Sequence, residues 1–82
     1  MNKLLVFTAQ WCGPCKAYKP TLAKLSQEQV EVVDIEEDTE ELRTKFNVGA
    51  VPTTVVLQDG QEVRRFVGPV TLADLQAALQ GG

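Results

Sequence analysis

Cys12 and Cys15 are the only cysteines in the sequence of this 82-residue chain, and two residues separate them. A disulfide between residues so close in sequence restricts the unfolded chain little, so a purely structural bridge is a poor explanation of the pair. A zinc site needs about four ligands, and the chain has no histidine, so such a site would have to be shared by two chains. The spacing therefore favours a pair that cycles between dithiol and disulfide.

The surrounding string, Trp11-Cys12-Gly13-Pro14-Cys15, follows a strand-like apolar run and opens a helical pattern. Only the thiolate attacks a disulfide, and the unpaired N–H groups at a helix start favour an anion there. We expect the pKa of Cys12 to fall from about 8.5 into the range of roughly 3.5–7.5 seen for activated cysteines. Cys12 is then the attacking thiol, and Cys15, one turn further on, is the resolving thiol.

Hydrophobic periodicity and turn residues predict the elements that position this pair. A buried strand covers residues 3–8, and Asp59-Gly60 is typical of a tight hairpin. The full prediction is strands at 3–8, 30–35, 53–57 and 62–67, with helices at 15–28, 37–46 and 71–79. Pro20 is expected to kink the first helix, and Thr71 with Asp74 to cap the last. The order β-α-β-α-β-β-α predicts one α/β domain over residues 1–82, with a four-stranded mixed sheet and three flanking helices.

The inner side of the helix predicted at 37–46 is assigned to Leu42, Lys45 and Phe46. Eight acidic residues and no basic residue lie between Glu28 and Glu41. This acidic run is interpreted as a solvated surface, with a steering patch for a basic partner as the alternative.

Composition excludes several classes of function. A chain that is 44% hydrophobic and 23% charged favours a folded domain over disorder. Its longest apolar run is too short to cross a bilayer, and no signal-like segment is recognised, so we expect a cytoplasmic protein without a membrane partner. Lysine and arginine are not clustered as a nucleic-acid surface requires. We also expect the chain to be a monomer.

The chain resembles the thioredoxin family at these residues. The string from Trp11 to Cys15 is identical to that family's active-site motif, and Lys16 and Pro20 match its helix. Further matches lie in Val51-Pro52-Thr53, which resembles the family's cis-proline turn, in Asp59-Gly60 and in Gly68. The resemblance implies a thioredoxin-like fold and a docking groove for target peptides. Its implied members are Trp11, Gly13, Pro14, Ala50, Val51, Pro52 and Gly68.

Three departures from the family pattern affect the expected chemistry. The resemblance starts at the family's central strand, so we expect no counterpart of the usual initial strand and helix. Val6 stands where typical members carry a buried aspartate, Thr8 replaces a tryptophan, and Val32 or Val33 falls where a partner lysine is usual. We therefore hypothesise that water or a group on the target accepts the proton of Cys15. The Gly-Pro spacer disfavours a glutaredoxin-like use of glutathione.

The resemblance implies a protein-disulfide reductase that acts on disulfide-containing target proteins and is recycled by a thioredoxin reductase-like enzyme. It implies no bound cofactor or metal, since the Cys12–Cys15 disulfide is itself the redox-active group. Three alternatives stay open at this point. They are an electron donor dedicated to one enzyme such as ribonucleotide reductase, a non-catalytic peptide-binding module, and a metal or iron–sulfur carrier built from two chains.

Overall fold

A four-stranded mixed sheet organises the computed structural model, which describes residues 2–81. The elements in chain order are β1 (Asn2–Thr8), α1 (Gly13–Ala23), the short 3-10 helix η1 (Gln27–Gln29), β2 (Val30–Asp34), α2 (Leu42–Lys45), β3 (Thr53–Gln58), β4 (Gln61–Val67) and α3 (Leu72–Leu79). The strand order is β2-β1-β3-β4. β1 runs parallel to β2 and antiparallel to β3, and β3 is antiparallel to β4. The predicted fold class is confirmed.

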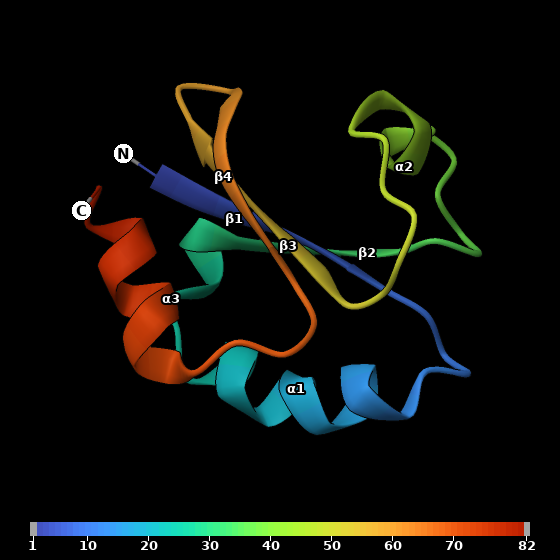
Figure 1. Ribbon diagram of the computed structural model, residues 1–82, viewed down its shortest axis with the longest axis horizontal. Helices are drawn as coiled ribbons and strands as arrows, with labels where there is room; N and C mark the ends of the chain where they lie inside the picture. Colours follow the sequence, from blue (N-terminus) through green and yellow to red (C-terminus); the bar gives the residue numbers. More distant parts are fainter. Residues whose placement is uncertain (1, 82) are drawn as a thin grey trace.

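Helices cover both faces of this sheet, with α1 and α3 on one side and α2 on the other (Figure 1). The first side encloses Leu4, Val6, Tyr18, Leu22, Leu25, Val56, Leu75 and Ala78. The second side encloses Leu5, Phe7, Val33, Val48 and Val55. Alternate residues of β1 thus enter both cores, which explains why its sequence is almost continuously apolar.

The first helix differs from its prediction at both ends. It begins at Gly13, continues through Pro20 and stops at Ala23, five residues before the predicted end. The Gln27 side chain donates to the carbonyls of Leu22 and Leu25 at 3.3 and 2.8 Å, which satisfies acceptors that a longer helix would have used. Only the short η1 follows before β2.

The second helix is much shorter than predicted, because the Asp38 side chain takes backbone N–H groups that a longer helix would have bonded to backbone carbonyls. The Asp38 carboxylate accepts the N–H groups of Leu42 and Arg43 at 2.9 and 2.7 Å, so the helix starts only at Leu42. Glu41, just before it, has a left-handed φ of 55°. Lys45 is exposed, so its assignment to the inner side was wrong, whereas Leu42 and Phe46 pack against the core.

Turn and cap chemistry follows the sequence closely. Asp59 and Gly60 have φ values of 52° and 83°, the two left-handed positions that a tight hairpin between β3 and β4 needs. The Thr71 side chain accepts the Asp74 N–H at 3.2 Å and caps α3 as predicted. No helix within residues 2–81 is long and apolar enough to cross a membrane.

Candidate redox site

Cys12 and Cys15 form a disulfide at the N-terminal end of α1, with their Cα atoms 5.2 Å apart. Cys12 is the residue that precedes the helix, and its backbone is extended. Its sulfur accepts the backbone N–H of Cys15 at 3.1 Å, and its carbonyl accepts that of Lys16 at 3.2 Å. As predicted, the segment with the two cysteines follows a strand and opens a helix, with Cys12 as the capping residue and Cys15 in the first turn. The pair can therefore exist as a disulfide or as a dithiol, which is the chemistry of thiol–disulfide exchange.

Helix geometry favours negative charge on the first sulfur when the pair is reduced. The first turn of α1 contains no acidic side chain, and Pro14 in that turn has no N–H to leave unpaired. The N–H of Cys15 points at the Cys12 sulfur, where it stabilises a thiolate more than a neutral thiol. The electrostatic surroundings are those of an activated cysteine.

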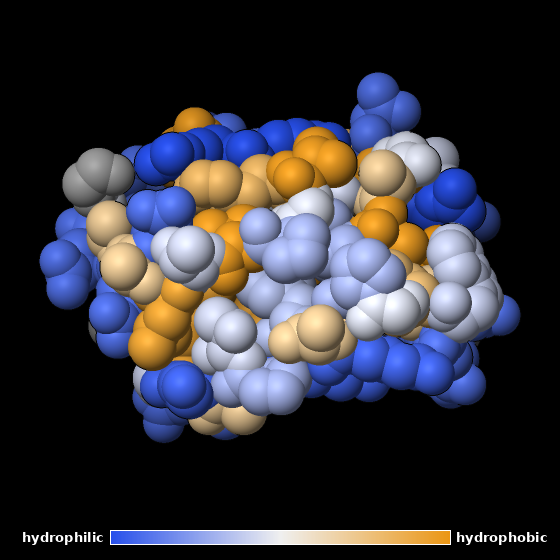
Figure 2. All heavy atoms as spheres, turned by 60° about the horizontal axis from the view of Figure 1, so that its bottom comes forward, coloured by the Kyte–Doolittle hydropathy of each residue, from blue (hydrophilic) through white to orange (hydrophobic). Residues whose placement is uncertain are grey.

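Access to the two sulfurs is unequal. Cys15 is fully buried, whereas Cys12 retains 5% exposure, and the neighbouring Trp11 is 67% exposed. Ala9, Ile35 and Val51 complete the apolar packing around the pair. In Figure 2 small hydrophobic patches lie toward the right-hand side of the molecule, next to pale and hydrophilic surface at that end. A target sulfur can thus reach Cys12 more easily than Cys15.

The segment before β3 approaches this end of α1. Its Val51–Pro52 peptide bond is cis, and the Val51 carbonyl oxygen lies 3.7 Å from the Cys12 sulfur. The Gly68 N–H donates to the Pro52 carbonyl at 2.8 Å, and the Thr53 hydroxyl donates to the Ala50 carbonyl at 2.6 Å. Residues far apart in sequence are therefore held around the disulfide.

The residues predicted to form a docking groove differ in exposure. Trp11, Gly13, Pro14 and Ala50 are exposed, and Val51 and Gly68 are half-buried. Pro52 is fully buried, so only its backbone neighbours are available at the surface. These seven residues lie on the β1–α1 connection, in the first turn of α1, in the segment before β3 and directly after β4.

Three residues at this end of the molecule were missed from the sequence. Ile35, Arg43 and Gly49 line a cavity of about 140 Å³ together with Trp11, Ala50 and Val51. Ile35 directly follows β2, and its N–H donates to the Thr8 carbonyl at 2.9 Å. The rule that functional residues gather beyond the carboxyl ends of parallel strands points to Ile35. Arg43 gave no such signal, because only the packing of distant segments places it beside Trp11 and Val51.

The interior beside Val6 contains hydroxyl groups rather than a carboxylate. Val6 is fully buried and pairs with Thr54 on β3. The Tyr18 hydroxyl lies 2.8 Å from that of Thr54, and burial raises the pKa of Tyr18 above its usual value despite this hydrogen bond. Within residues 2–81 no aspartate or glutamate is buried. The described part of the chain thus offers Cys15 no buried carboxylate as a base.

Metal binding finds little support in the side chains. In the part of the chain that the structure describes, no three histidine, cysteine, aspartate or glutamate side chains come together as ligands. Valine carries no charge, so neither the buried Val33 nor the half-exposed Val32 supplies the lysine that the family pattern has on this strand.

Comparison with protein families matches residues 1–81 to the family Thioredoxin. The chain is 44% identical over 72 residues to thioredoxin H-type 1 of Nicotiana tabacum, which covers 82% of this chain and 57% of that protein. It is 41% identical over 69 residues to the bifunctional thioredoxin reductase/thioredoxin of Mycobacterium leprae, covering 79% of this chain and 15% of that protein. The chain spans between 54 and 62% of the length of three H-type relatives.

Solved structures give the same result. Thioredoxin-2 of a malaria parasite superposes with a TM-score of 0.86 at 26% identity, covering 100% of this chain and 84% of that one. The thioredoxin of Fasciola hepatica superposes with a TM-score of 0.82 at 34% identity, covering 98% of this chain and 79% of that one.

Proposed function

We propose that this chain, which belongs to the thioredoxin family, reduces disulfides in other proteins through Cys12 and Cys15. The observation that carries the proposal is the disulfide at the start of α1, with one sulfur beside the exposed Trp11 and the other buried. A purely structural disulfide does not need to lie at the start of a helix. A nucleophilic cysteine needs both the helix N-terminus, which stabilises its thiolate, and access to its target.

Reduction of a target disulfide takes place in two successive thiol–disulfide exchange steps. The Cys12 thiolate attacks one sulfur of the target, the target's S–S bond breaks, and its other sulfur leaves as a thiolate. Cys15 then loses its proton and attacks the Cys12 sulfur, which releases the second target sulfur. Two electrons pass from the dithiol to the target, and the chain is left with the Cys12–Cys15 disulfide. The target finishes as two thiols after taking up two protons.

Backbone geometry supports distinct roles for the two cysteines. The N–H of Cys15 stabilises the Cys12 thiolate before attack, and burial of Cys15 keeps it from reacting with other disulfides. Because Val6 provides no carboxylate, we propose that water or a group on the target accepts the Cys15 proton. Trp11, Gly13, Pro14, Ala50 and Val51 form the surface on which the target docks, and the buried Pro52, whose carbonyl accepts the Gly68 N–H, supports it.

The cellular setting is proposed from the relatives. A reductase must return the disulfide to the dithiol, and fusion of the two activities is named in the Mycobacterium leprae relative. We propose a separate thioredoxin reductase-like enzyme as the partner, a monomeric chain and a cytoplasmic role in redox homeostasis. No cofactor is needed, because the exchanged electrons are carried by the cysteine sulfurs.

Insulin reduction with dithiothreitol as the electron source tests the proposal. The chain should accelerate reduction, and Cys12→Ser should abolish the acceleration. Cys15→Ser should instead arrest a mixed disulfide with the target on Cys12, which intact-mass measurement and its release by reductant would identify. A reduced, folded chain that binds insulin without accelerating its reduction would identify a non-catalytic binding module instead.

A further inference from the structure

A small cavity shares a wall with the disulfide. It has a volume of about 140 Å³ and is lined by Trp11, Ile35, Arg43, Gly49, Ala50 and Val51. Ile35 and Val51 also pack against the cluster that contains Cys12 and Cys15. A side chain of a target that enters this cavity is therefore separated from the disulfide only by Ile35 and Val51, and its contacts can affect the first exchange step.

Arg43 is the charged residue of this cavity, and its side chain is held in place. Its Nε donates to the Val48 carbonyl at 3.2 Å. Within residues 2–81 the one salt bridge joins Arg65 to Glu62, so Arg43 has no carboxylate partner there. The nearby Asp38 accepts the backbone N–H of Arg43 and not its guanidinium. The two terminal nitrogens of the guanidinium make no hydrogen bond within the described residues and stay available to a ligand.

We propose that Arg43 makes the chain select target disulfides that have an acidic residue close to the attacked cysteine. This inference rests on the proposed function and adds the chemical class of its substrates. An apolar side chain of the target fills the cavity between Ile35 and Val51, and a neighbouring carboxylate pairs with the guanidinium. Arginine presents a planar set of donors that fits a carboxylate, which makes it suited to this selection.

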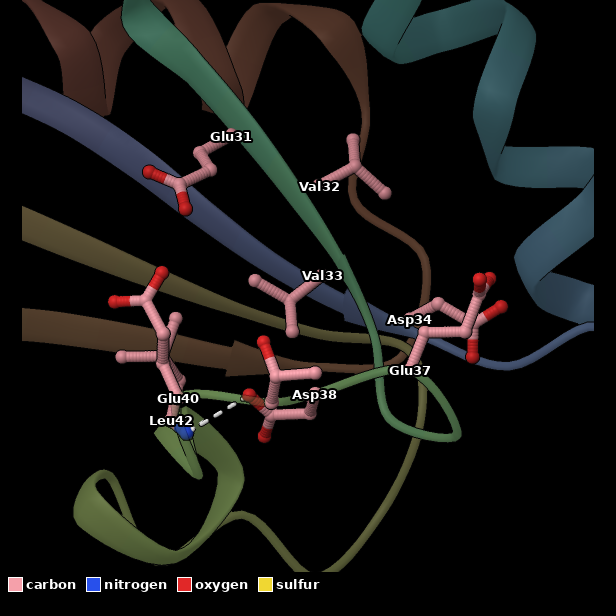
Figure 3. A pocket seen from close by; sticks show the side chains of 9 residues that line it. Glu31, Val32, Val33, Asp34, Glu37, Asp38, Glu40 and Leu42 are labelled. Atoms are coloured by element: carbon pink, nitrogen blue, oxygen red, sulfur yellow. Dashed lines mark hydrogen bonds between the residues drawn. The ribbon is translucent and has the colours of Figure 1, made fainter.

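The acidic groove on the neighbouring surface confines this preference to a few target positions. Figure 3 shows that groove between β2 and the segment leading into α2, with the carboxylates of Glu31, Asp38 and Glu40 around it. It has a volume of about 300 Å³, and no lysine or arginine lines it. A long acidic segment would be repelled there. The favoured target therefore carries one carboxylate within reach of Arg43 rather than a run of them.

Peptides with a single cysteine, activated as a mixed disulfide with thionitrobenzoate, provide a direct test. The low pKa of thionitrobenzoate makes it the leaving group, so the peptide sulfur joins Cys12 and the peptide's flanking residues occupy the docking surface. Pairs of peptides differ only by Asp or Asn at each of the first few positions on either side of the cysteine. The rate of thionitrobenzoate release by the reduced chain gives one Asp/Asn ratio for each position.

We expect one position to give a ratio of about two to five, the size of effect typical of a single exposed ion pair. Arg43→Gln should bring that ratio to about one, and added salt should lower it in the unaltered chain. Arg43→Lys should retain part of the ratio, because it keeps the charge but loses the Nε–H that bonds to Val48. Lys45→Gln is the matched control, since it removes the same charge from the same helix outside the cavity.

Each other outcome overturns the proposal. Ratios near one at every position would show that Arg43 selects nothing. A ratio that Lys45→Gln lowers as much as Arg43→Gln would show a general charge effect, and a ratio lost in Arg43→Lys would show a role in ordering the loop only. Failure of the proposed function is recognised separately, because the chain would then release thionitrobenzoate from no peptide faster than dithiothreitol does.

Discussion

The sulfur of Cys12 lies 3.7 Å from the carbonyl oxygen of Val51, a residue 39 positions further along the chain. This oxygen opposes a negative charge on the sulfur, whereas the Cys15 N–H favours it at 3.1 Å. The N–H is nearer, and its hydrogen bond strengthens when the acceptor is ionised. The balance therefore favours a thiolate.

Reduced Cys12 should titrate below free cysteine, whose pKa is about 8.5. Even a value near 7 would raise the thiolate fraction at neutral pH more than tenfold over the roughly 3% of a free thiol. The rate of alkylation by iodoacetamide, followed against pH, measures this. Cys15→Ser provides the control in which Cys12 is the single thiol. A midpoint near that of free cysteine would refute the activation on which the proposed attack depends.

Val6→Asp should alter the pH dependence of the second exchange. A carboxylate in this part of the interior supplies a base that the described residues lack, so turnover near pH 7 should rise and its increase toward pH 9 should become less steep. Disulfide reduction measured from about pH 6 to about pH 9 gives the profile. Burying the carboxyl group should also lower the free energy of unfolding by about 1–3 kcal/mol.

Val6→Asn is the matched control for that experiment, because it places a polar group of similar size in the same site without a titrating base. The two variants should be destabilised to a similar degree. An unchanged pH profile in a folded Val6→Asp chain, or the same change in Val6→Asn, would show that proton acceptance does not limit the reaction.

Local sequence predicted the features that depend on few residues. The apolar run of β1, the Asp59-Gly60 turn and the dithiol at a helix start are such features, since each follows from adjacent side chains and backbone preference. The helix predicted at 37–46 failed because the Asp38 carboxylate takes the first two N–H groups of α2. These two hydrogen bonds could not be inferred from hydrophobic periodicity, which depends only on the spacing of apolar residues and does not show when a side chain takes a backbone N–H group.

The cavity beside the disulfide was missed for a different reason. Its lining comes from four separate stretches of the chain, and only their packing brings Ile35 and Arg43 next to Trp11. Similarly, the resemblance predicted Pro52 as a docking residue, and its complete burial depends on contacts that the sequence does not reveal. Long-range packing, rather than local preference, decides which members of a predicted site reach the surface.

Tyr18→Phe should destabilise the fold by about 1–2 kcal/mol, because it leaves the buried Thr54 hydroxyl without its partner. The double variant with Thr54→Val removes both polar groups and should regain much of that loss. Urea unfolding of the two single variants and the double variant measures this coupling. Additive losses in the double variant would mean that the two hydroxyls do not stabilise each other.

Tyr18 also gives the fold a dependence on alkaline pH. Burial raises its pKa in the folded chain, so the unfolded chain loses the phenol proton first as the pH rises past about 10. The stability that Tyr18 provides is therefore full below that pH and declines above it. Urea midpoints compared at about pH 8 and about pH 11 should fall less in Tyr18→Phe than in the unaltered chain. An equal fall in both would exclude this residue as a cause.

Arg65 should matter more for stability than its ion-pair partner Glu62. The guanidinium binds the Glu62 carboxylate at 2.6 and 2.7 Å, and one of its nitrogens also donates to the Phe46 carbonyl at 2.6 Å, which ties β4 to the end of α2. Glu62→Gln removes only a partly exposed pair, for which about 0.2–1 kcal/mol is usual. Arg65→Gln removes the bond to the backbone as well and should lower the free energy of unfolding further.

Acid titration separates the contribution of the Arg65–Glu62 ion pair from that of the bond between Arg65 and the Phe46 carbonyl. The Arg65 hydrogen bond lowers the pKa of Glu62, so the stability from this pair is present at neutral pH and is lost as the pH falls through that lowered value. The loss should be absent in Glu62→Gln, while the additional cost of Arg65→Gln should persist at low pH, because a backbone carbonyl does not titrate. Urea unfolding of both variants at neutral and acidic pH measures this. If both variants lost equal stability at neutral pH, the Phe46 contact would contribute nothing, and Arg65 would stabilise the fold only through its ion pair with Glu62 within β4.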